Sequence, residues 1–119
     1  MPREFSRTVR IAETIKRAMA PLVSDWMREH QIGMGSVTDT DVSPDLKRSR
    51  VYVSVYGCAD KTGAIAALND HGGRFRHALS GQVRLKHIPA IEFVLDESIE
   101  RGDAMSRMLE SLRPADQDD

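Results

Sequence analysis

At 119 residues, with 40% hydrophobic and 29% charged side chains, the chain is long enough for a single globular domain whose core needs neither disulfide nor metal. Its lone cysteine, Cys58, excludes an intramolecular disulfide, and because no apolar run suits a membrane span or a signal peptide, we expect a cytoplasmic protein that binds no membrane. The net charge of −1 conceals two parts of opposite charge. Residues 1–91 contain 14 Lys and Arg against 9 Asp and Glu, whereas residues 92–119 contain 3 against 9. This separation indicates either a partner of dense negative charge or a solvated acidic tail.

The first predicted element is a long amphipathic helix that ends near His30. Its apolar residues recur at steps of three and four, the spacing of one helix face: Ile11, Ile15, Ala18, Met19, Leu22 and Trp26. Ser6 is the candidate N-cap, because its hydroxyl can accept a hydrogen bond from a free amide of the first turn. Pro21 removes one amide donor inside this pattern, so we expect a kink there.

Two strands are predicted next, joined by the turn sequence SPDLKR. The second strand alternates between an apolar and a polar set: Val51, Val53 and Val55 against Tyr52, Ser54 and Tyr56. In the first strand Val37 and Val42 have opposite parity, so both can face inward only if a β-bulge lies between them. The two tyrosines either stack unpaired bases or simply cover the open face of the sheet.

Two short helices follow, from about Asp60 to Asp70 and from about Gly73 to Leu85, with a pair of glycines at their junction. We expect these glycines to end one helix and start the next. Gly73 is predicted to take the left-handed conformation, which costs little in a residue that has no Cβ.

The remaining elements are a third strand over 91–95, directly after Pro89, and a last helix over about 105–112. Ser98 is the candidate cap of that helix. The acidic tail over 113–119 is expected to fray.

The element order α-β-β-α-α-β-α predicts an α+β fold, in which a three-stranded sheet carries the helices on one face. No repeat and no linker is visible in the sequence. We therefore expect one domain over 1–119, with an ordered core over about 6–112.

Catalytic and metal-binding motifs are missing from the sequence. There is no Walker A loop and no G-x-G-x-x-G, and His71, His77 and His87 are six and ten residues apart, which suits no compact helical metal pair. Nothing sets a nucleophile or an acid against a base. We therefore expect neither an enzyme nor a metal site, and no cofactor.

Basic residues gather in two segments. In the second short helix Arg76, Ser80, Arg84 and His87 fall on one stripe, which Arg74 flanks and Lys86 extends. The first helix adds five cations near its N-terminal half: Arg3, Arg7, Arg10, Lys16 and Arg17. Cations there oppose the helix dipole, so local helix stability does not explain them. Either both segments bind a phosphate backbone, or they are solvated faces with scattered charge.

Four stretches in this order resemble one family: RTVRIAETIKRAM, VSPDLKRSRVYVSV, LNDHGGRFRHAL and VRLKHIPAIEFVLDESIERG. The element order matches the type II KH fold, but the G-x-x-G loop of ordinary KH domains is absent. The chain is instead similar to the ribosome-binding factor A family, which has an Ala-x-Gly kink there. His71, Gly72 and Gly73 occupy the kink positions, with His71 in place of the usual alanine.

The resemblance implies a non-enzymatic assembly factor that binds the immature 30S subunit and 16S rRNA and supports late maturation of the rRNA ends. It also implies a role in growth in the cold and release from the subunit by a GTPase. We expect the chain to act as a monomer, with the basic residues of both segments contacting RNA. Two other functions stay open: a generic KH-like RNA binder, and a protein-interaction module that uses the acidic end and the open sheet face.

Overall fold

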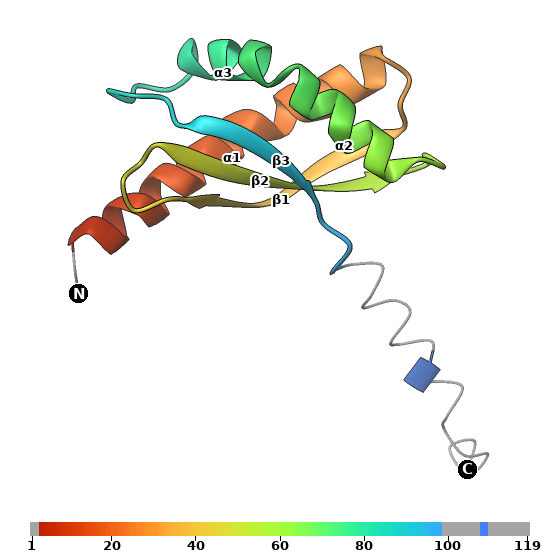
Figure 1. The fold of residues 1–119 in the computed structure, drawn as a ribbon, viewed down its shortest axis with the longest axis horizontal. Coiled ribbons are helices and arrows are strands. Elements are labelled where there is room, and N and C mark those ends of the chain that lie inside the picture. Colours follow the sequence, from red (N-terminus) through yellow and green to blue (C-terminus); the bar gives the residue numbers. More distant parts are fainter. Residues whose placement is uncertain (1–2, 99–107, 110–119) are drawn as a thin grey trace.

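The computed structural model describes residues 3–98 and 108–109 and contains the six elements expected over residues 3–98. In chain order they are α1 (Arg3–Glu29), β1 (Met34–Val42), β2 (Arg48–Tyr56), α2 (Lys61–Asp70), α3 (Gly72–Ser80) and β3 (Ala90–Leu95) (Figure 1). The α-β-β-α-α-β order and the α+β class are confirmed. Of the helix expected over 105–112, only Met108 and Leu109 are described; both are helical and exposed. The tail over 113–119 lies outside the described residues.

The sheet has the order β1-β2-β3, with β2 antiparallel to β1 and parallel to β3. The register between β1 and β2 shifts after Val37, which pairs with Val53, so that Asp39 pairs with Tyr52. This irregularity is the predicted bulge. It allows Val37 and Val42, whose parities differ, both to pack against the core.

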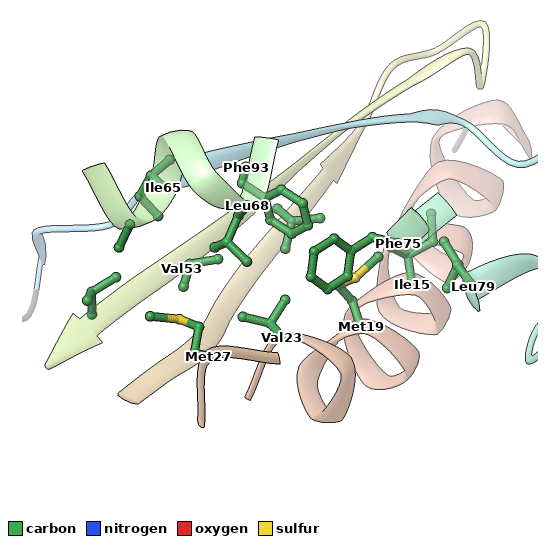
Figure 2. Close-up of a cluster of buried hydrophobic side chains, with 13 residues drawn as sticks. Ile15, Met19, Val23, Met27, Val53, Ile65, Leu68, Phe75, Leu79 and Phe93 are labelled. Carbon is green, nitrogen blue, oxygen red and sulfur yellow. The ribbon is translucent and has the colours of Figure 1, made fainter. Parts of the chain in front are cut away.

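The core is one cluster to which three helices and two strands contribute. Its members are Ile15, Met19, Val23 and Met27 of α1, Val51, Val53 and Val55 of β2, Ala64, Ile65 and Leu68 of α2, Phe75 and Leu79 of α3, and Phe93 of β3. Figure 2 shows these side chains converging between the sheet and the helices. The buried valines of β2 alternate along the strand, and α1, α2 and α3 all pack on the sheet face that these valines form, as the sequence predicted.

Two predicted helix boundaries are wrong. Ser6 is not an N-cap, because α1 already begins at Arg3 and continues through Pro21 to Glu29. The helix predicted to reach Leu85 ends at Ser80, where Gly81 follows. Glycine is a poor helix former, and the last helical amide bonds are made by residues 81–83 back onto Ala78 and Leu79.

The predicted left-handed glycine at the junction is also wrong. A single residue, His71, separates α2 from α3, with φ −104° and ψ 17°. Gly72 and Gly73 are the first residues of α3, and neither has a positive φ. The kink therefore needs no left-handed residue. Within the described residues no helix is long and apolar enough to cross a membrane.

Candidate nucleic-acid interface

The segment 81–89 between α3 and β3 is a loop, and Arg76 of α3 holds it in place. The Nε and Nη2 atoms of Arg76 both donate hydrogen bonds to the carbonyl oxygen of Ile88, at 3.1 and 2.7 Å. Arg84 and Lys86 are exposed on this loop. The predicted stripe along one helix is therefore wrong. Arg76 and Ser80 belong to α3, but Arg84 and His87 belong to the loop that Arg76 holds in place.

The turn between β1 and β2 is organised by Ser43 and Asp45. The Ser43 hydroxyl donates to the Asp45 carboxylate at 2.6 Å, and the Lys47 amide donates to the same carboxylate at 3.0 Å. Both hydrogen bonds lower the pKa of Asp45 from its ordinary value of 3.8, and the bond from the Ser43 hydroxyl has the larger effect. Leu46, at the tip, has φ +63°. The Ala90 amide donates to the Lys47 carbonyl at 2.9 Å, which ties the turn to the start of β3.

The loop, the turn and the first turns of α1 meet at one end of the molecule (Figure 1) and enclose a hollow of about 430 Å³. We call it the basic cleft. Five of its lining residues are basic: Arg7, Lys47, Arg76, Lys86 and His87. Five are apolar: Ile11, Leu46, Leu85, Ile88 and Pro89. Asp45 is the one carboxylate of its lining. Four of the five basic residues, the arginines and lysines, are cations, and such an excess of positive charge around one hollow favours an anionic ligand.

A second hollow of about 300 Å³ shares part of this lining and extends the cationic surface along α1. It adds Arg10 of α1 and Arg84 of the loop to Arg7 and Lys86. The two segments that the sequence singled out thus come together in space, although one is a helix start and the other a loop. Their side chains can neutralise neighbouring phosphates of one nucleic-acid strand.

Not every predicted RNA-binding residue joins this surface. Arg74 lines a different groove, between α1 and α3, together with Asp25 and Glu29 of α1. Lys16, half-buried, and Arg17, exposed, lie further along α1 and line neither hollow. Arg3 is the first residue of α1, and its side chain lies outside the described residues.

The kink residues serve packing in the described structure. Nδ1 of His71 lies 2.9 Å from the Ala67 carbonyl oxygen, so this nitrogen carries the proton and donates to the end of α2. The His71 ring packs against Trp26 of α1, with 5.3 Å between ring centroids. His71 therefore joins three helices. Gly73 is exposed and has open space where a Cβ would project.

Two of the five basic cleft residues were not among the predicted RNA-binding residues. His87 had a place in the predicted stripe without a role, and Lys47 was treated only as part of a turn. The turn sequence SPDLKR places Lys47 at a hairpin tip. Its neighbours around the hollow are residue 76 and residues 85–89, and no local sequence pattern indicates that these distant segments lie beside the turn. Leu46 was missed as a lining residue for the same reason.

The open face of the sheet is held by its own polar contacts. The Tyr52 hydroxyl donates to Asp41 at 3.1 Å, and Arg50 Nε lies 3.1 Å from a Glu92 carboxylate oxygen. The hydrogen bond with Tyr52 and the charge of Glu92, in that order, raise the pKa of Arg50. Among the described residues, no group of three or more His, Cys, Asp and Glu is placed to hold a metal ion.

Comparison with known proteins places this geometry in context. Residues 7–109 match the family model described as Ribosome-binding factor A. The chain is 36% identical over 112 residues to Ribosome-binding factor A of Alkalilimnicola ehrlichii, with 92% of this chain and 86% of that protein covered. It is 38% identical over 112 residues to the protein of the same name from Trichormus variabilis, with 92% and 84% covered.

Two solved structures are similar in fold. The crystal structure of ribosome-binding factor A from Thermus thermophilus superposes with a TM-score of 0.66 at 25% identity, covering 74% of this chain and 93% of that one. A homology model of the Thermus thermophilus protein, fitted into a cryo-electron microscopy map of a 30S–RbfA complex, gives a TM-score of 0.60 at 26% identity, covering 71% and 89%. That protein is thus known in complex with the small ribosomal subunit.

Proposed function

Because the chain belongs to the ribosome-binding factor A family, we propose that it binds the immature 30S subunit through 16S rRNA and supports late maturation of that rRNA. The family membership supports ribosome binding, and the complex of the Thermus thermophilus relative supports the small subunit as the target. Under the same proposal the chain is a non-enzymatic cytoplasmic factor that supports growth in the cold and is released from the subunit by a GTPase.

One observation carries the RNA part of the proposal: two segments distant in the sequence bring Arg7, Arg10, Arg84 and Lys86 onto adjoining hollows. Each Lys or Arg that neutralises a phosphate releases counterions from the RNA, and this release raises the affinity of the protein for the RNA. Such contacts position the protein on a shaped RNA and read no base sequence. We therefore expect the chain to bind an rRNA arrangement rather than a sequence motif.

The test is sedimentation of purified protein with precursor and mature small subunits over a series of salt concentrations. We expect the double variant Arg10→Glu, Lys86→Glu to fold normally, since both side chains are exposed. It should bind precursor subunits much more weakly. The slope of log affinity against log salt should fall by about 0.7–0.9 for each phosphate that no longer has its cation.

The control is Arg28→Glu at the other end of α1, which makes at one site the charge reversal that the double variant makes at two. Arg28 is exposed and pairs with Asp25, 18 residues and about 27 Å of helix from Arg10. Its reversal should leave binding within about twofold of the parent. A folded double variant that sediments with precursor subunits as tightly as the parent would refute the basic cleft as the RNA surface.

A further inference from the structure

The basic cleft has a feature that phosphate binding does not use: five of its lining residues are apolar, and we call these five its apolar floor. Ile11, Leu46, Leu85, Ile88 and Pro89 line the same hollow as the cations. Its volume of about 430 Å³ lies within the roughly 300–1,000 Å³ that is typical of sites for small organic ligands. A phosphate needs charge but no apolar wall, so this lining fits a ligand with both an anionic and an apolar part.

Leu46 contributes to this floor from a strained backbone conformation. Its φ of +63° lies in the left-handed region, which leucine rarely adopts and which asparagine or glycine adopts readily. Nevertheless an apolar side chain stands there, half-buried, at the tip of the turn. A strained residue held by its surroundings is a pointer to a binding function.

Arg76 contributes a fixed plane to the same hollow. Two of its five N–H groups are bonded to the Ile88 carbonyl, which leaves three for a ligand. The two bonds also fix the orientation of the guanidinium. A guanidinium of fixed orientation can stack on an unpaired base or grip a phosphate with two parallel hydrogen bonds.

From these features we infer that the basic cleft receives one unpaired nucleotide of the RNA, with its base on the apolar floor and its phosphate at the cationic rim. RNA is a better occupant than a protein side chain, because the lining holds Arg7, Lys47 and Lys86 but one carboxylate, that of Asp45. This inference rests on the proposed RNA binding. It would restrict tight binding to RNA in which a nucleotide stands free of its duplex.

The test uses three RNA hairpins that differ at one position: one with a single bulged adenosine, one with an abasic residue in the bulge, and one fully paired. The abasic hairpin keeps the phosphate and removes the base. We expect the parent protein to bind the bulged hairpin on the order of tenfold more tightly than either of the others, the low part of the range for seating one base.

Leu46→Asn is the discriminating variant, because asparagine tolerates this backbone and the variant should therefore fold as stably as the parent. It should lose most of the preference for the bulged hairpin and keep the parent's affinity for the paired one. Lys86→Gln is the charge control and should weaken binding to all three hairpins alike.

Equal binding of the three hairpins by the parent would overturn the inference and leave the proposed function standing. So would a bulge preference that Leu46→Asn does not change, since the base would then lie elsewhere. Equal binding together with a loss of binding to precursor subunits by Leu46→Asn would indicate a protein side chain in the hollow. If the parent bound neither the hairpins nor the precursor subunits, the proposed function itself would be refuted.

Discussion

At the scale of single residues, the described structure shows two glycines with opposite roles. Gly33, between α1 and β1, has φ +103°, and a Cβ added there would lie 2.5 Å from the Tyr56 carbonyl oxygen. Gly73 sits in the first turn of α3 with no atom within 4 Å of such a Cβ. The sequence drew attention to the second because it belongs to a pair, but the constraint acts on the first.

Alanine substitutions at these two positions should therefore have different effects on the free energy of unfolding. Gly33→Ala places a side chain in the left-handed region against backbone, and should lower the free energy of unfolding by about 1–3 kcal/mol. Gly73→Ala replaces a poor helix former in open space, and should leave that free energy unchanged or raise it by up to about 1 kcal/mol. Urea denaturation of both variants measures the difference. A destabilising Gly73→Ala beside a neutral Gly33→Ala would show that the backbone at these sites is not as described.

At the scale of elements, sequence patterns predicted those features that depend on periodicity. The parity of Val37 and Val42 demanded a bulge, and the bulge is there. The end of α3 was missed because Val83 continues the four-residue spacing of Phe75 and Leu79; in the structure Val83 packs against the core from the loop instead. The anchor of that loop joins residues twelve apart, from Arg76 to Ile88, and no helical or strand period reports it.

The loop anchor gives the prediction at this scale. Arg76→Lys keeps the charge and removes the planar fork that bonds the Ile88 carbonyl, so loop residues 84–88 should exchange their amide hydrogens faster. Stability should fall by roughly 0.5–1.5 kcal/mol, the net worth of a hydrogen bond. Arg84→Lys, on the same loop and exposed, is the matched control and should change neither quantity. Unaltered exchange in Arg76→Lys would mean that the Ile88 bonds do not hold the loop.

At the scale of the whole molecule, the fold brings the start of α1, the β1–β2 turn and the α3–β3 loop to one end (Figure 1). From the sequence one could predict the α+β class and the face of the sheet that the helices cover. The sequence also singled out the cations of α1 and of the segment after Gly73, of which Arg7, Arg10, Arg84 and Lys86 line adjoining hollows. Their meeting around one hollow depends on the path of the α3–β3 loop, which the hydrogen bonds from Arg76 to the Ile88 carbonyl hold in place. Arg74 shows the limit of such prediction, since adjacency in sequence did not place it on that surface.

The most direct test of the basic cleft as the RNA surface is to crosslink the unmodified protein to precursor small subunits with ultraviolet light. The crosslinked peptides are then identified by mass spectrometry. We predict crosslinks within residues 7–14, 45–47 and 84–89, the ranges that supply most of the lining of the two hollows, and none within the sheet face around Tyr52. Crosslinks confined to that sheet face, or to the groove of Arg74 between α1 and α3, would contradict this assignment.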